Sequence, residues 1–421
     1  MSLVSPAFAF PIPAQPLVLG AARALAARLG AGEIISRPDL AAILGEHFGG
    51  SDVAGRWSVH DAHAALELGQ VLTLQQNPAL TCTLAPELAD EAFSRFEALV
   101  PSQNNRGDGQ IALQQFATPP RLAWIAARAC AIASGEQVLE PSAGTGMLAV
   151  WADKAKARLA LNEISPLRRE CLGAVFPAAS VTAHDGELID ELLGADVAPS
   201  VVLMNPPYSH GLERGHDGRT GARHLRSAWK RLLPGGRLVA VMPEWFDLPR
   251  FLNGISGPVA LRLNAAIERA FVKQGTSITT RLLVLDKADG GDSPVIARPT
   301  SFAELCFLVD QLPARKVLTD GQVPPPKSFA PLRLVAGGRK PMPIAPRCVA
   351  TAPAIRPLAY EALKVPAPIA EQVGHYLPYR PSRIAIPGAV EHPTPLVESV
   401  AMGSITAPVP EAVPQLPADL I

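Results

Sequence analysis

The sequence lacks the features that direct a chain to a membrane, a structural metal or an oxidising compartment. It has no run of about eighteen apolar residues, so we expect no membrane-spanning segment. Its five cysteines form no Cys-x-x-Cys pair and have no histidine at metal-ligand spacing, which argues against a disulfide framework and a zinc site. Pro11, Pro13 and Pro16 interrupt the apolar start, which also lacks a basic segment, so we expect no signal peptide. These absences predict a soluble cytoplasmic protein without a metal.

Excess charge of either sign is also absent, because the 421 residues include 38 basic and 38 acidic side chains. No long-range field would draw the chain to nucleic acid, so any such surface must be local. The densest basic stretch is the Gly/Arg/His-rich segment 209–223 with the cations that follow it. Arg219–Arg231 is therefore the candidate contact to DNA or RNA, although a solvated polar face explains this cluster almost as well.

The most informative stretch that is present runs from Val138 to Val150, with the sequence VLEPSAGTGMLAV. It predicts the end of a buried strand, a turn of small residues at Ala143–Gly146, and a helix from Met147 to Ala155. Strand, glycine turn and helix together form the first crossover of a doubly wound α/β domain. Glycines in such a turn let the backbone approach a ligand, and the helix start offers free N–H groups to it.

Glu140 at the end of this strand decides which ligand is expected. A carboxylate at that point would repel the pyrophosphate of a dinucleotide, whereas it would hold an amino group or a sulfonium. The sequence therefore favours S-adenosylmethionine over NAD as the cofactor. We expect the cofactor to contact Glu140 and the turn residues Ser142, Ala143, Gly144 and Gly146.

Two further strands are expected to bring polar side chains to the same edge. Ala157–Leu161 reads as the second strand, and Glu163 after it is placed to accept both ribose hydroxyls, with an ordinary surface acid as the alternative. Ser200–Met204 reads as the fourth strand and places Asn205–Tyr208, an Asn-Pro-Pro-Tyr motif, where open α/β sheets bind ligands.

The Asn-Pro-Pro-Tyr motif suits methylation of an amine conjugated to a ring. Such an amine is a weak nucleophile because its lone pair is delocalised. The Asn205 side-chain oxygen and the Pro206 carbonyl can accept its two N–H groups and localise the lone pair. Pro206 and Pro207 hold that carbonyl outward, and Tyr208 can stack on the flat substrate and face the sulfonium. A proline-stiffened turn without function is the alternative.

Together the two motifs resemble those of Rossmann-like S-adenosylmethionine-dependent methyltransferases of the adenine-N6 DNA type. The cofactor motif matches as E-x-x-x-G-x-G, Glu140–Gly146, and the catalytic motif as N-P-P-Y. The resemblance implies that Phe116, Thr118 and Pro119, in an F-x-T-P segment, help to hold the methionine end of the cofactor. It also implies that Asp185 takes the adenine amine of the cofactor. An ordinary helix start, with Thr118 as its cap and Pro119 at the first helical position, is the alternative for that segment.

The chain divides into three predicted parts around this domain: a helical N-terminal domain (1–105), the methyltransferase domain (106–290) and a proline-rich extension (291–421). Within the first part the pattern predicts helices that begin near Leu17, at Arg37, after Ser58 and at Pro86. In the second, 264–271 and 279–286 are expected to form a final antiparallel pair of strands. In the third part the pattern predicts one helix, over 302–312, and the rest is expected to be extended connector.

Segments 375–383 and 392–405 resemble the segment that joins methyltransferase and helicase in bacterial strawberry-notch-like methylase/helicase proteins. The N-terminal stretch around Trp57 resembles the start of the same proteins, in their methylase part. This resemblance implies a helicase domain or subunit as a partner. The sequence contains no lysine-bearing phosphate loop of its own.

The leading functional prediction is methyl transfer from S-adenosylmethionine to the exocyclic amine of adenine in DNA. Methylation of glutamine N5 in a protein also uses N-P-P-Y and stays an alternative, as does a non-catalytic module that docks a helicase. The F-x-T-P segment and the basic stretch favour nucleic acid over protein.

Overall fold

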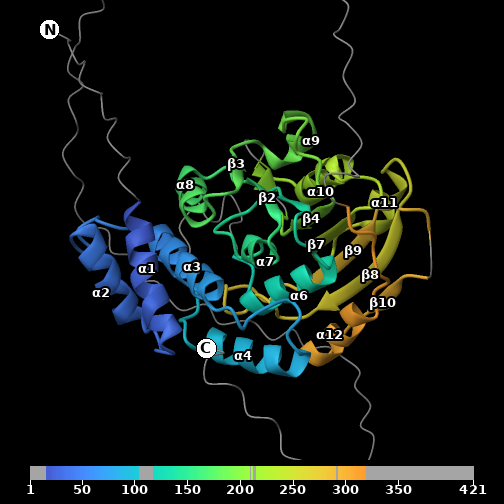
Figure 1. Ribbon diagram of the computed structural model, residues 1–421. Helices are drawn as coiled ribbons and strands as arrows, with labels where there is room; N and C mark the ends of the chain where they lie inside the picture. The colour runs from blue at the N-terminus through green and yellow to red at the C-terminus, as the bar shows by residue number, and fades with distance from the viewer. Residues whose placement is uncertain (1–15, 104–116, 209, 212–214, 291–292, 319–421) are drawn as a thin grey trace, which may run out of the picture. The chain divides into compact units, whose positions relative to one another are not determined.

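The computed structural model describes residues 16–103, 117–208, 210–211, 215–290 and 293–318 (Figure 1). Phe116, the segments 375–383 and 392–405 and most of the predicted extension lie outside the described residues. No described helix is both long and apolar enough to cross a bilayer.

A single eight-stranded sheet organises the described chain, with the strand order β10-β8-β9-β7-β4-β1-β2-β3. β9 is antiparallel to β7 and β8, and the other neighbours are parallel. The strands are β1 (Gln137–Glu140), β2 (Arg158–Asn162), β3 (Ser180–Thr182), β4 (Val201–Met204), β7 (Arg237–Pro243), β8 (Ala260–Ile267), β9 (Thr280–Asp286) and β10 (Val295–Ala297). A further short pair joins β5 (His210–Gly211) to β6 (Gly215–His216). This topology confirms the predicted Rossmann-like sheet, including its final antiparallel pair.

Alternating side chains of the central strands bury both faces of the sheet. Val138, Val201 and Val239 belong to one core, while their neighbours Leu139 and Val202 belong to the other. The first face is covered by α6 (Pro120–Cys130), α7 (Ala149–Lys154) and α8 (Pro166–Val175). The second is covered by α9 (Ile189–Leu192), α10 (Thr220–Arg231) and α11 (Leu248–Asn253).

The four predicted N-terminal helices are confirmed as α1 (Leu17–Gly30), α2 (Arg37–Phe48), α3 (Val59–Gln76) and α4 (Pro86–Ala98). Capping boxes at Ser36 and Ser58 explain where α2 and α3 begin. Every residue of α3 from Ala62 to Leu74 is buried. The apolar core of these helices is continuous with the core on the first face of the sheet. The boundary expected near residue 105 therefore does not divide the apolar core.

The sheet also extends past the boundary expected at residue 290. β10 pairs with β8, and α12 (Phe302–Asp310) packs against α4 and α6. Figure 1 shows α4 and α12 side by side although they are distant in sequence. The guanidinium of Arg128 in α6 holds α12 through Asp310, at 2.6 Å from Nε to Oδ1. We therefore place the end of the folded unit at or beyond Leu318, because residues 293–318 bury apolar and charged groups against the sheet.

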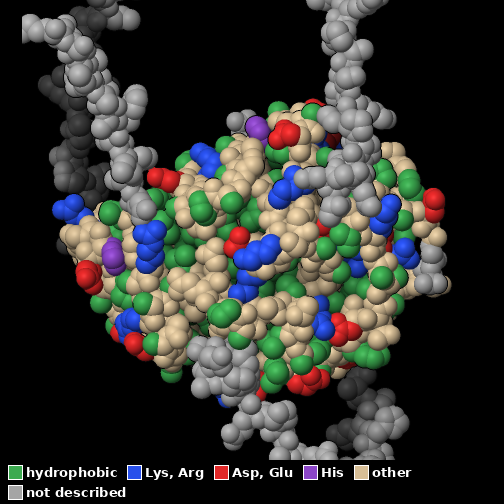
Figure 2. All heavy atoms as spheres, in the orientation of Figure 1, with side chains coloured by type: hydrophobic (Ala, Val, Ile, Leu, Met, Phe, Trp, Pro, Cys, Tyr) green, Lys and Arg blue, Asp and Glu red, His purple; other side chains and the backbone are tan. Residues whose placement is uncertain are grey.

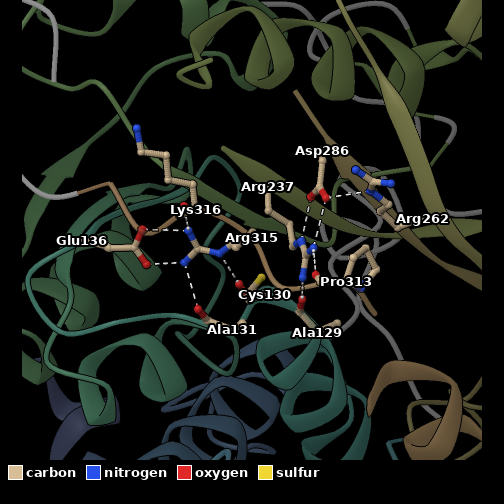
Figure 3. A network of polar contacts seen from close by, with 10 residues as sticks. All are labelled: Ala129, Cys130, Ala131, Glu136, Arg237, Arg262, Asp286, Pro313, Arg315 and Lys316. Carbon is tan, nitrogen blue, oxygen red and sulfur yellow. Dashed lines mark hydrogen bonds and ion pairs between the residues drawn. The ribbon is translucent and has the colours of Figure 1, made fainter. Parts of the chain in front are cut away.

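Two buried arginines fasten this last segment to the end of the sheet opposite the glycine turn (Figure 3). Arg315 pairs with Glu136, just before β1, and donates to the carbonyl of Cys130 at 2.8 Å. Arg237, at the start of β7, pairs with Asp286 at 2.7 Å and donates to the carbonyl of Pro313 at 2.9 Å. Both ion pairs are nearly inaccessible to solvent, so each charge depends on its partner.

Replacing Arg315 by Met is expected to lower the free energy of unfolding by about 3–5 kcal/mol, because Glu136 would remain as an uncompensated buried charge. Urea denaturation followed by circular dichroism measures this loss. Lys316→Met serves as the matched control, because Lys316 is exposed. Equal stability of the two variants would show that the segment after α12 does not hold the sheet.

Candidate active site

Three strand ends bring the predicted site residues together at one edge of the sheet. β1 ends at Glu140, β2 is followed by Glu163, and β4 is followed by Asn205. β1 lies between β2 and β4, the point where the strand order reverses and α/β sheets bind ligands. A cavity of about 30 Å³ opens there. Its lining residues are Ala117, Thr118, Glu140, Ser142, Ala143, Gly144, Thr145, Met147, Leu148, Arg168 and Asn205.

This cavity has room for about one water molecule, far less than a nucleoside needs. Of the described residues that were predicted for the site, the following do not line it: Pro119, Gly146, Glu163, Asp185, Pro206, Pro207 and Tyr208. They lie on the surrounding elements instead.

The glycine turn has the backbone that its sequence predicts. Gly144 and Gly146 have φ values of +57° and +93°, which residues with a Cβ rarely adopt. The N–H of Gly144 donates to Glu163 Oε2 at 2.8 Å, and the N–H of Ser165 donates to Glu163 Oε1 at 2.8 Å. Glu163 therefore ties the turn to the end of β2. A second lone pair on each oxygen stays open to a ligand hydroxyl.

Glu140 is a buried acid with one unused oxygen. Its side chain is 3% exposed, and Oε2 has no hydrogen-bond partner among the described residues. Burial, with the nearby charge of Glu163, holds the pKa of Glu140 well above its usual range. A cation placed beside Oε2 would stabilise the ionised form.

Asn205 is held between Thr118 and Tyr208. Its Nδ2 donates to Thr118 Oγ1 at 3.0 Å, and its Oδ1 accepts from the Tyr208 hydroxyl at 2.9 Å. Pro119 is the N-cap of α6 and Pro120 its first residue, so the alternative reading of Thr118 as that helix's cap is wrong. Thr118 instead orients the amide of Asn205. Tyr208 is half-buried, and burial raises the pKa of its hydroxyl.

Asp185 already has a local role at the end of β3. Its Oδ1 accepts from the backbone N–H of Glu187 at 2.9 Å and caps the short 3-10 turn Gly186–Leu188. This contact presents the carboxylate at the same edge of the sheet as Glu163.

Asn162 holds the three loops together, and the sequence reading missed it. Its Nδ2 donates to the carbonyls of Pro141 (3.0 Å) and His184 (2.9 Å). Its Oδ1 accepts from the Thr182 hydroxyl and the His184 N–H, both at 2.8 Å. All of its hydrogen-bonding groups are used inside the protein. The signal in the sequence was an amide at the end of an otherwise apolar strand, directly before Glu163.

His224 of α10 packs under the loop that contains Asp185. A Cβ on Gly186 would lie 2.5 Å from Nδ1 of His224, so only glycine fits there. Nδ1 has no partner among the described residues. Burial lowers the pKa of His224 from 6.5 to about 4, although the carboxylates of Glu187 and Asp185 oppose the shift and Arg223 adds to it.

The lowered pKa of His224 predicts an acid-sensitive stability. Between pH 6.5 and 4 the unfolded chain binds a proton at His224 that the folded protein does not, so stability is lost as the pH falls through this range. Between pH 7 and 5 the wild type is expected to lose about 2 kcal/mol more than His224→Gln, which cannot titrate there. Urea denaturation of both proteins at the two pH values measures the difference. Equal losses of stability in the two proteins would mean that folding does not lower the pKa of His224.

The basic segment Arg219–Arg231 is largely neutralised within the protein. Arg223 pairs with Glu187 at 2.6 Å, and Lys230 pairs with Asp190 at 2.8 Å. Arg231 donates to backbone carbonyls, including that of Val197 at 2.8 Å. On the face in Figure 2, the blue side chains of the described residues stand in separate groups, several with red ones beside them. Counting cations therefore overstates the positive charge of this stretch, because Glu187 and Asp190, from the segment after β3, pair with two of them.

No family model matches the chain. Over 126 residues it is 30% identical to the ribosomal RNA small subunit methyltransferase C of Chromohalobacter salexigens, across 30% of this chain and 36% of that protein. The chain thus matches little more than a third of the relative's length. Methyltransferases of the kind to which this relative belongs use S-adenosylmethionine, which is also the cofactor that the sequence predicts.

Solved structures resemble the chain as well, among them the following two. TrmN from Thermus thermophilus is 23% identical, with a TM-score of 0.31 over 40% of this chain and 48% of that one. The modification subunit of a type I restriction enzyme from Vibrio vulnificus is 15% identical, with a TM-score of 0.39 over 68% of each chain. Because these likenesses are weak, we take the fold from the strand order itself.

Proposed function

We propose that the chain is an S-adenosylmethionine-dependent methyltransferase that acts on the exocyclic amine of adenine in DNA. One observation carries the proposal: the amide of Asn205 lines the same cavity as Glu140 and the glycine turn. A group that binds an amine substrate and an acid suited to a cationic cofactor are therefore adjacent. Direct transfer between two ligands needs this proximity.

The cofactor would be held from three loops. Glu140 and the turn Ser142–Gly146 would take its methionine end, Glu163 its ribose hydroxyls, and Asp185 its adenine amine. Thr118 and Pro119 would close the site from the start of α6. When bound, S-adenosylmethionine supplies an electrophilic methyl group on a sulfonium.

Asn205 and Pro206 would then prepare the target amine. Asn205 Oδ1 and the carbonyl of Pro206 accept its two N–H groups, so the lone pair turns toward the methyl donor. The Tyr208 hydroxyl now occupies one lone pair of Asn205 Oδ1, and the other stays open to the substrate. No general base is required at the start, because the amine sheds its proton after it has attacked.

The base would reach this site only when it is outside the helix. Enzymes that modify a base in duplex DNA extrude it into a pocket and hold it by hydrogen bonds and stacking. Tyr208 beside Asn205 offers the ring for stacking. RNA is the second candidate substrate, favoured by the identity with a ribosomal RNA methyltransferase.

The test is methyl transfer measured in parallel on three substrate classes. Wild-type protein with tritiated S-adenosylmethionine is incubated with unmethylated DNA, with transcribed RNA and with cell protein. We expect label in DNA that digests to N6-methyladenine, and Asn205→Ala provides the background. Label in RNA alone would mean that the substrate is RNA and not DNA, and label in protein would favour glutamine methylation. Label in none of the three would favour the non-catalytic, helicase-docking alternative.

A further inference from the structure

We propose that Arg168 binds the carboxylate of the cofactor's methionine end, opposite Glu140, which binds its ammonium group. Glu67 of the N-terminal helices acts as the residue that positions Arg168. The proposal rests on the proposed cofactor and assigns a binding role to two residues that neither motif contains.

Arg168 reaches the site from the first turn of α8. Side chains on a helix point back toward its N-terminus, and α8 begins just after Glu163 and Ser165. The guanidinium therefore lies over the glycine turn, where its Nη1 is 3.7 Å from the position of a Cβ on Gly144. Arg168 is 3% exposed and lines the same cavity as Glu140.

The partners of Arg168 leave part of its guanidinium unused. Nη2 donates to Glu67 Oε2 at 3.2 Å. Nε is buried and has no hydrogen-bond partner among the described residues. A guanidinium has five N–H donors, and leaving one of them unpaired in the protein interior is costly. A ligand with a carboxylate would supply the missing acceptor.

Two of the described residues that line the cavity thus each have an unpaired buried atom, an acceptor on Glu140 and a donor on Arg168. Glu140 Oε2 and Arg168 Nε are both buried without partners in the described part of the chain. An α-amino acid group carries an ammonium and a carboxylate on one carbon, so it can satisfy both at once. The methionine end is the only part of S-adenosylmethionine with this chemistry.

Glu67 positions Arg168 through their ion pair. It lies in α3, is 1% exposed, and accepts from the Thr145 hydroxyl at 3.3 Å as well as from Arg168. One carboxylate of the N-terminal helices therefore contacts both the glycine turn and α8. By this contact the helices 17–98 complete the cofactor site rather than only supporting the sheet.

Two ligands that differ only in the amino acid group test the proposal. S-adenosylhomocysteine carries this group, and 5′-methylthioadenosine has the same nucleoside and sulfur without it. By calorimetry, Arg168→Met is expected to bind S-adenosylhomocysteine about 10-fold to 100-fold more weakly, the usual value of a hydrogen bond to a charged group. Its affinity for 5′-methylthioadenosine should equal that of the wild type. Glu67→Gln should show a smaller loss of the same selectivity.

Two variants serve as controls for effects of the substitution on folding. Arg168→Met leaves Glu67 buried without its partner, so the double variant Glu67→Gln/Arg168→Met removes both charges and should show the same ligand selectivity. Arg95→Met removes an exposed guanidinium of α4 and should bind both ligands normally. The wild type itself gives a further readout, because decarboxylated S-adenosylmethionine should bind about 10-fold to 100-fold more weakly than the intact cofactor.

Equal losses of both ligands in the Arg168 variants, or no loss of either, would overturn the assignment of Arg168 and leave the cofactor assignment standing. Equal binding of intact and decarboxylated cofactor by the wild type would do the same. A wild-type protein that binds none of these nucleosides would instead refute the proposed function, and the inference with it.

Discussion

Asn205→Ala is expected to lower the rate of methyl transfer to nucleic acid by a factor of about 10² to 10³. This is the usual cost of removing one donor or acceptor that acts on the transition state. Thr118 holds the nitrogen of this amide and Tyr208 its oxygen, so the oxygen is in a fixed position. The affinity for S-adenosylhomocysteine should stay within a few-fold of the wild type, because Asn205 only borders the cofactor cavity. Single-turnover kinetics and calorimetry measure the two quantities separately.

Two neighbouring variants control this result. Tyr208→Phe keeps the ring but removes the hydroxyl from Asn205 Oδ1, so most of the rate should remain. Thr118→Val removes the acceptor that orients the amide, so the rate should fall, but by less than in Asn205→Ala. If Asn205→Ala transfers methyl groups at the wild-type rate, the amine is bound elsewhere.

Gly146→Val is expected to unfold the protein or to lower its free energy of unfolding by about 2–6 kcal/mol, the sum of backbone strain and overpacking. Gly146 has a φ of +93°, and a Cβ there would lie 2.5 Å from Cε2 of Phe176 and 3.1 Å from Cδ2 of Leu172. Both neighbours are buried in the core between α8 and the sheet. Urea denaturation measures the loss.

Gly144→Val should fail in a different way. The backbone there is also left-handed, with a φ of +57°, but the nearest atom to a Cβ is Nη1 of Arg168 at 3.7 Å. The variant is therefore expected to fold and to lose binding of S-adenosylhomocysteine, because the side chain projects into the cofactor cavity. Calorimetry on the folded variant checks this. Normal binding would place the cofactor elsewhere, and equal stability of the two variants would remove the distinction between the glycines.

The elements that the sequence predicted best depend on local chemistry. The turn Ala143–Gly146, the capped starts of α2 and α3, and the apolar strand before Asn205 are all specified by residues within one or two turns of chain. Local patterns of this kind determine a strand or a helix boundary wherever the tertiary structure does not oppose them. The doubly wound sheet could be predicted from these elements, because right-handed crossovers between parallel strands leave few possible arrangements.

The end of the folded unit was harder to predict, because proline content masked it. β10 is only three residues long and α12 only nine, and both stand in a region whose composition is typical of a linker. Contacts to distant residues hold this region, such as Arg128 on Asp310 and Arg315 on Glu136, which are 182 and 179 positions apart. Composition carries no information about such a pair.

By itself, the sequence determined the kind of site in this protein: a glycine turn with an acid before it, and an amide after the fourth strand. Only the tertiary structure decided what surrounds that site. It paired Arg223 and Lys230 of α10 with acids from the segment after β3 and placed Glu67 of α3 beside Arg168 of α8. Charges act through space, at distances of a few ångströms, so their effect depends on which distant segments meet. Only the folded chain shows which distant segments meet.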